Sequence, residues 1–404
     1  MSSTTATPTA AAAEIGRAEK SGMSTPQLAR LRSTIEQDIE AGEYHGATVI
    51  VARHGDVVLE AAIGSTDAST QRSAALDDVF RVLSVTKALT NTAVYRAIDA
   101  GLLTLNTRVV DVIPEYIGSD RFLARGKETV TVAHLLSHRS GMNGTPEPLP
   151  YAQLGDLSAV IEKICEMPLA GEPGTTVDYS PTLNHALLGE MVRRVHGDTS
   201  FSQMMAREVL DPIGMVDTAF GLPERLAERV VPIRAMFGNE GWLTAHDLEV
   251  LNDVISGDAE MPWVGSVTTA RDIFRLAEVY RRRGKTESGE QLVSPAIIDV
   301  ATRVQTGDDP NNLYLGMAKK RGWPWAPANL GYGFQLSGLG AAPSMLGTLT
   351  SARTFGNHGA GSTVFWVDPE RDVTFVLLTA GSMEESDNYL RCQRLSDLAI
   401  CAAL

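Results

Sequence analysis

The first regular pattern in the chain is an apolar stripe at the spacing of a helix. The stripe is formed by Leu28, Leu31, Ile35 and Ile39. Thr25 can cap this helix, Pro26 suits its first position, and Gly42 can end it. The pattern predicts one amphipathic helix between Thr25 and Gly42.

Two apolar runs follow this helix, with a short polar segment between them. Residues 47–52 and 57–63 predict two buried strands, and the Arg-His-Gly-Asp segment at 53–56 predicts the tight turn that joins them. A helix followed by a hairpin whose strands are both apolar indicates an antiparallel sheet covered by helices.

The last part of the chain shows strand patterns again. Residues 362–367 and 373–378 predict two strands, and the Asp-Pro-Glu-Arg-Asp segment at 368–372 is a strong turn signal between them. A final helix is predicted from about residue 386 to about residue 402. Sheet elements are therefore expected at both ends of the chain.

The middle of the chain is predicted to be mostly helical and rich in loops. Helical periodicity is clear at 187–195 and 273–280. We expect an α+β fold in which helices flank an antiparallel sheet built from both chain ends. The expected parts are a disordered leader at 1–23, a sheet domain at 24–103 and 331–404, and an inserted helical domain at 104–330.

The composition is that of an ordinary globular protein with a large core. A net charge of −14 disfavours nucleic acid and anionic membranes as partners, because phosphate binding requires a basic surface. The three cysteines, Cys165, Cys392 and Cys401, have no metal-ligand spacing and are expected to be buried thiols in a reducing compartment. We expect no metal and no cofactor, and a homo-oligomer stays open.

The N-terminal residues carry no targeting pattern. Residues 1–13 are rich in Ser, Thr and Ala, without a basic start or an apolar run, so a signal peptide is not expected. No segment is long and apolar enough to span a membrane. The chain is therefore predicted to be cytoplasmic.

The first candidate for chemistry is the pair Ser84 and Lys87. On a helix this spacing places both side chains on one face. Lys87 can activate the Ser84 hydroxyl only if burial or neighbouring cations lower its pKa. The alternative is a serine N-cap followed by a solvated lysine, but the surrounding residues are apolar and a lysine is unfavourable in a first helical turn.

Two further segments can contribute to the same site. Tyr179 follows a Pro-Gly turn and precedes a helix, where it can relay a proton or simply pack at the junction. The segment 355–363 is rich in small residues and leads into a strand. Such a segment can present a backbone N–H to an oxyanion, or can be a simple turn.

Together the three segments resemble the motifs of the serine β-lactamase and penicillin-binding-protein superfamily, in which Ser-x-x-Lys, Tyr-x-Asn and Lys-Thr-Gly converge on one pocket. Other segments are similar to family segments: 134–142 (His-Leu-Leu-Ser-His-Arg-Ser-Gly-Met), 211–218 (Asp-Pro-Ile-Gly-Met-Val-Asp-Thr) and 268–272 (Thr-Thr-Ala-Arg-Asp). The resemblance runs from about Thr25 to the C-terminus. It implies a β-lactamase/transpeptidase-like fold with the active site in a cleft between the sheet and the helical domain.

The resemblance also implies roles for single residues. Ser84 would be the nucleophile, and Lys87 and Tyr179 would transfer its proton, with the choice of main base left open. The backbone N–H groups of Ser84 and Ala360 would form the oxyanion hole. The third motif corresponds here to Asn357-His358-Gly359 and would bind the substrate.

Two departures from the family motifs bear on the substrate. Asn357 stands where β-lactamases and transpeptidases have a cation, and Pro181 stands where the family often has an asparagine. Both changes remove recognition of charged or peptide-like substrates. The chain therefore looks like the esterase branch, the family VIII carboxylesterases, acting on a small ester. His358 is expected to replace the lost cation at low pH or to hydrogen-bond the substrate, unless it only packs on the strand.

Other functions stay open at this point. An acyltransferase would form the same acyl-enzyme and pass the acyl group to an acceptor other than water. A β-lactamase or D-amino amidase is disfavoured by Asn357 and Pro181. A non-catalytic scaffold of the same fold would have no use for Ser84, Lys87 and Tyr179 together. The pocket walls are expected to include the loop 142–151, Trp263, and the segment 323–325.

Overall fold

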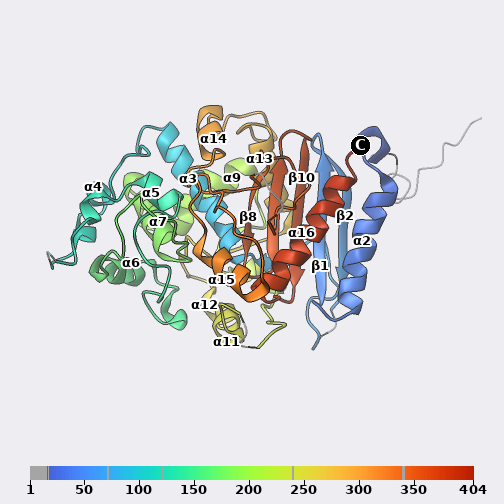
Figure 1. The fold of residues 1–404 in the computed structure, drawn as a ribbon, viewed down its shortest axis with the longest axis horizontal. Helices are drawn as coiled ribbons and strands as arrows, with labels where there is room; N and C mark the ends of the chain where they lie inside the picture. Colours follow the sequence, from blue (N-terminus) through green and yellow to red (C-terminus); the bar gives the residue numbers. More distant parts are fainter. Residues whose placement is uncertain (1–15, 17, 71, 121, 239–240, 339–341) are drawn as a thin grey trace, which may run out of the picture.

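The computed structural model describes residues 16, 18–70, 72–120, 122–238, 241–338 and 342–404. Its main sheet has six strands in the order β2-β1-β10-β9-β8-β7, and all neighbours are antiparallel (Figure 1). The strands are β1 (Gly46–Arg53), β2 (Asp56–Gly64), β7 (Gln335–Leu336), β8 (Phe355–Gly359), β9 (Thr363–Asp368) and β10 (Val373–Ala380). The prediction of a sheet built from both chain ends is confirmed, because β1 pairs with β10 from Gly46↔Ala380 to Arg53↔Val373.

The central strands β1, β9 and β10 are buried on both faces, which explains why they are nearly continuous apolar runs, whereas the edge strand β2 alternates between buried and partly exposed positions. Helices α2 (Thr25–Glu40) and α16 (Glu385–Cys401) pack together on one face, whereas α13 (Ala270–Arg281) packs against β1, β9 and β10. Successive side chains enter opposite cores: Val49 and Val51 belong to one cluster, and Ile50 to the other. Apolar residues are thus favoured at most positions of β1.

The start of the fold differs from the prediction in two details. The N-cap of α2 is Ser24, not Thr25: Ser24 has an extended backbone, and its hydroxyl accepts a hydrogen bond from the Gln27 N–H at 3.4 Å. The predicted disordered leader also extends too far. Ala18 and Met23 are buried in the core, and Met23 pairs with Ala403. Residues 1–15 and 17 of the predicted leader lie outside the described residues.

The region between the two sheet segments is mostly helical, as predicted. Its helices are α3 (Thr86–Asp99), α4 (Val109–Val112), α5 (Val132–Leu136), α6 (Leu157–Glu166), α7 (Leu183–Val195), α8 (Phe201–Met205), α9 (Asp211–Ile213), α10 (Glu224–Ala227), α11 (Ala245–Glu249), α12 (Leu251–Val254), α14 (Pro295–Ala301) and α15 (Asn312–Arg321). Shorter turns are the 3₁₀ segments η1 (Leu83–Val85), η2 (Pro114–Ile117), η3 (Lys127–Thr129) and η4 (Tyr151–Gln153), and the π segment η5 (Ala206–Leu210).

A second, small sheet that was not predicted links the two regions. Its order is β4-β6-β3-β5, formed by β3 (Val79–Arg81), β4 (Ala219–Phe220), β5 (Val230–Val231) and β6 (Ser266–Thr268). Helix α3 packs on α7, whereas α13 of the predicted inserted domain packs on the main sheet. The predicted domain boundaries stay a prediction.

Three further observations concern membrane-spanning helices, the cysteines and metal-ligand groups. Across the ranges given above, no helix is both long and apolar enough to cross a membrane. Cys165 and Cys392 are buried as expected, but Cys401 near the end of α16 is exposed. No group of His, Cys, Asp and Glu side chains within these ranges could hold a metal ion.

Candidate active site

Ser84 lies where a strand of the small sheet turns into a helix. β3 ends at Arg81, the 3₁₀ turn η1 spans Leu83–Val85, and α3 begins at Thr86. The turn is tight enough that Leu83, a non-glycine residue, adopts a φ of 46° in the left-handed region. Because the first N–H groups of a helix have no intrahelical acceptor, the Ser84 N–H is available to a ligand.

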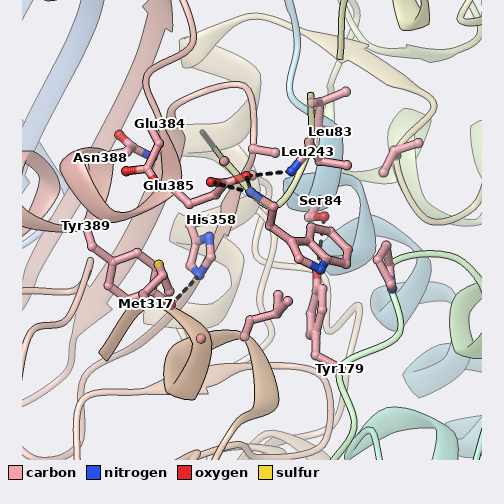
Figure 2. Close-up of a pocket in the computed structure, with 18 of the residues that line it drawn as sticks. Leu83, Ser84, Tyr179, Leu243, Met317, His358, Glu384, Glu385, Asn388 and Tyr389 are labelled. Carbon is pink, nitrogen blue, oxygen red and sulfur yellow. Dashed lines mark hydrogen bonds between the residues drawn. The ribbon is translucent and has the colours of Figure 1, made fainter. Parts of the chain in front are cut away.

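Lys87 and Tyr179 converge on the Ser84 hydroxyl. Lys87 Nζ lies 3.0 Å from Ser84 Oγ, and the Tyr179 hydroxyl lies 3.1 Å from the same atom. Lys87 Nζ also donates to the Trp263 carbonyl at 3.0 Å, which fixes its position. Figure 2 shows Ser84 and Tyr179 close together at one end of the cavity. The structure thus brings together the three residues that the sequence singled out.

Burial sets the protonation of this group. It lowers the pKa of Lys87 to about 7, although the negative charge of Glu147 opposes the change. Burial raises the pKa of Tyr179 to about 12, because a buried phenolate is unfavourable. At neutral pH a neutral amine at Lys87 can therefore accept a proton, while Tyr179 is a proton donor. Of the two causes considered from the sequence, burial or neighbouring cations, burial is the one that lowers the pKa of Lys87.

His138 supports Tyr179 and was not assigned a role from the sequence. Its ring stacks on the Tyr179 ring with centroids 4.5 Å apart. The Ser180 N–H and the Asn184 side-chain amide both lie within hydrogen-bond distance of His138 Nδ1, at 3.3 and 3.0 Å. Burial lowers the pKa of His138 to about 3, so the ring is neutral. His138 lies in the segment 134–142, whose only signal was the family resemblance.

The end of β8 lies against Ser84. A Cβ atom on Gly359 would lie 2.2 Å from the Val82 carbonyl oxygen and 3.1 Å from the Ser84 nitrogen, so only glycine fits. Ala360 follows and lines the same cavity as Ser84. The two backbone N–H groups predicted for the oxyanion hole therefore lie on neighbouring segments, and their role stays a prediction.

Asn357 and His358 are oriented differently from each other. The Asn357 side chain donates to the Gly333 carbonyl at 3.1 Å and does not line the main cavity. It faces a small hollow behind Ser84, together with Lys87. In the structure its amide group ties β8 to the loop at Gly333, and substrate binding by Asn357 stays a prediction.

His358 lines the main cavity as a neutral side chain. Its Nε2 lies 2.8 Å from the Gln335 amide nitrogen and 3.4 Å from the Tyr389 hydroxyl, and Figure 2 shows the ring beside Tyr389. Burial, aided by the charge of Lys87, lowers the pKa of His358 to about 4. The expectation that His358 supplies a positive charge therefore holds only below about pH 4. At neutral pH its imidazole is a hydrogen-bonding group.

The cavity above Ser84 has a volume of about 380 Å³ and is lined mainly by apolar and aromatic side chains. They include Leu83, Tyr151, Trp242, Leu251, Trp263, Met317 and Met383. Tyr151 and Trp263 were expected in the wall. Trp323 instead packs beside Tyr314 and Tyr389, and Trp325 is exposed.

Comparison with known proteins shows which family the chain belongs to. The family model described as Beta-lactamase matches residues 31–396, which include every residue placed in the site. The chain belongs to the beta-lactamase family. The resemblance inferred from the motifs is therefore confirmed.

Individual members of the beta-lactamase family cover nearly the whole chain. Esterase EstB of Burkholderia gladioli is 29% identical over 384 residues, which are 88% of this chain and 91% of that relative. A solved family VIII carboxylesterase is 25% identical with a TM-score of 0.73, covering 94% of this chain and 99% of its own. A penicillin-binding protein homologue from Caulobacter crescentus is 26% identical with a TM-score of 0.76 and the same coverage. These structures confirm the predicted fold class.

Proposed function

We propose that this protein is a serine esterase that cleaves small carboxylic esters through an acyl-enzyme on Ser84. The observation that carries the proposal is the convergence of Lys87 Nζ and the Tyr179 hydroxyl on Ser84 Oγ, at 3.0 and 3.1 Å, at one end of a largely apolar cavity. The likeness to Esterase EstB and to a family VIII carboxylesterase supports it.

In the first half of the reaction, Ser84 Oγ attacks the ester carbonyl carbon and neutral Lys87 takes the hydroxyl proton. The N–H groups of Ser84 and Ala360 stabilise the oxyanion that forms. The bond to the alcohol oxygen then breaks, and Tyr179 donates its proton to that oxygen. The Lys87 ammonium returns a proton to Tyr179, which leaves an acyl group on Ser84.

In the second half, water attacks the acyl-enzyme carbonyl and gives its proton to Lys87. The bond to Ser84 Oγ then breaks, the acid leaves, and the Lys87 ammonium gives its proton to Oγ, which restores the neutral amine and the hydroxyl. Because a neutral amine is the base, this assignment favours Lys87 over Tyr179 as the main base. The raised pKa of Tyr179 suits it to protonate the leaving alcohol.

The neutral third motif bears on the choice among related activities. Asn357 donates to the Gly333 carbonyl and His358 is uncharged at neutral pH, so neither offers a cation to a β-lactam carboxylate. Transfer of the acyl group to an alcohol would follow the same first half-reaction. EstCE1, a hydrolase with promiscuous acyltransferase activity, shares the fold of this chain at 22% identity.

A panel of substrates tests the proposal. We expect p-nitrophenyl acetate and butyrate to turn over with an initial burst of nitrophenol, and nitrocefin and a D-alanyl amide to turn over poorly. Ser84→Ala should abolish the burst, whereas Ser33→Ala on the exposed face of α2 should retain it. Ester turnover that survives Ser84→Ala would refute the mechanism, and nitrocefin turnover without ester turnover would indicate a β-lactamase.

A further inference from the structure

The charged side chains that line the active-site cavity are mostly acidic. Among the residues the structure describes, they are Glu147, Lys320, Glu384 and Glu385. Lys320 Nζ lies 3.0 Å from a Glu384 carboxylate oxygen, so these two charges largely cancel. Within the described ranges no ion pair joins Glu147 or Glu385 to a cation. The cavity wall therefore holds more acidic than basic groups. Burial raises the pKa of the Glu147 carboxyl, while the hydrogen bond from Thr182 and the charge of Lys87 lower it. A cation bound beside Glu147 would favour the charged form of this carboxyl in the same way.

Glu147 lies on the side of the cavity that holds Tyr179. The loop that carries it is tied to the residue before Tyr179, because the Gly144 N–H donates to an Asp178 carboxylate oxygen at 3.2 Å. Its charge acts on Lys87 and on Tyr179. In the proposed reaction the alcohol oxygen receives its proton from Tyr179, so the alcohol part of the substrate must lie on this side.

Aromatic side chains accompany Glu147 at the mouth of the cavity. Tyr151 and Trp242 line the cavity and also an outer hollow that adjoins it, and Glu147 lines both. The carboxylates of Glu147 and Asp247 both act on the Tyr151 hydroxyl. Aromatic faces next to a carboxylate attract organic cations, above all quaternary ammonium groups.

These observations lead to a substrate class. We propose that the cavity selects esters whose alcohol part carries a positive charge, such as esters of amino alcohols or of quaternary ammonium alcohols. Glu147 would attract the cation, and Tyr151 and Trp242 would contact it. This inference rests on the proposed esterase function and adds to it the chemistry of the alcohol.

The test compares esters of the same acyl group whose alcohols differ mainly in charge. Butyrylcholine is positive, 3,3-dimethylbutyl butyrate is its neutral isostere, and 4-butyryloxybutanoate is negative. Titration of the released acid gives kcat/KM for each. For the unmodified protein we expect kcat/KM to be about fivefold or more higher for butyrylcholine than for the neutral isostere, and lowest for the anionic ester.

In the Glu147→Gln variant, the kcat/KM for the cationic ester should lie within about twofold of that for the neutral ester. Glu43→Gln removes the same charge from an exposed turn between α2 and β1, and should keep the original ratio. Equal rates for the cationic and neutral esters, or a preference that survives Glu147→Gln, would overturn the inference. Failure to hydrolyse any ester, p-nitrophenyl butyrate included, would instead refute the esterase function on which it rests.

Discussion

Replacing Lys87 with arginine tests whether a neutral amine is the base. Burial lowers the pKa of Lys87 from the ordinary 10.5 to about 7, which corresponds to roughly 5 kcal/mol against the charged form. At about pH 7.5 the amine would then be neutral in about three-quarters of the molecules, against about 0.1% for an ordinary lysine. Arginine has a similar length, but it stays protonated at this pH and cannot act as the base.

The measurement is kcat/KM for p-nitrophenyl butyrate between about pH 5 and pH 9, followed at the isosbestic wavelength of nitrophenol. Because the active form is the neutral amine, the unmodified protein should gain activity as the pH rises through about 7 and then level off. In the Lys87→Arg variant, kcat/KM should fall about a thousandfold and should not rise with pH in this range. Lys319→Arg, a matched change on the exposed face of α15, should keep both.

Two results would refute the reasoning about Lys87. One is a rise centred above about pH 9, which would mean that the amine keeps an ordinary pKa. The other is an arginine variant that retains activity within about tenfold of the unmodified protein, since general-base catalysis contributes more than this. Circular dichroism of each variant distinguishes loss of the base from loss of the fold.

Three further changes probe the same site. Tyr179→Phe keeps the ring stacked on His138 but removes the proton donor, so ethyl butyrate should lose about a hundredfold in kcat and the nitrophenyl ester clearly less; equal losses would contradict the role. Gly359→Ala would place a Cβ atom 2.2 Å from the Val82 carbonyl oxygen and should lower kcat about a hundredfold by displacing β8; an unchanged kcat would contradict this. Lys87→Met should raise the free energy of unfolding by about 2 kcal/mol at about pH 6, after allowance for lost hydrogen bonds. Because the pKa of Lys87 is lower in the folded than in the unfolded protein, the buried lysine destabilises the folded state fully below about pH 7. This destabilisation disappears as the pH rises towards 10.5, and with it the stability gained by the methionine variant. Urea titrations that show the same gain near pH 10 would contradict this.

Much of the sheet could be predicted because its signals are local. The apolar runs at 47–52 and 57–63 are central parts of β1 and β2, and the turn between them lies where it was expected. The second hairpin agrees equally well with β9 and β10. β1, β9 and β10 are buried on both faces, so most of their positions are apolar, and β2 carries apolar residues at all its buried positions. The short strand β3 has no such run, and its pairing with β5 and β6 depends on distant residues.

In the candidate site too, some residues could be predicted from local spacing, whereas others depend on contacts between segments that are distant in the chain. Spacing along the chain was enough to nominate Ser84 and Lys87, since residues three apart on a helix are neighbours. Glu147 gave no signal, because a single acidic residue in a Pro-rich loop is ordinary until the loop folds over the cavity. His138 was named only as part of a family segment, and its stacking on Tyr179 depends on a contact between separate segments.

By itself, the sequence determined the arrangement of the sheet, the mostly helical region between its two parts, and the three motifs that identify the family. Only the tertiary structure decided the charges in the site. Lys87 owes its low pKa to burial beneath residues such as Trp263, 176 positions away, and Tyr179 reaches Ser84 across 95 positions. Hydrophobic periodicity is a property of neighbours in the chain. Solvent exclusion and electrostatic fields are properties of neighbours in space, and these neighbours exist only once the chain has folded.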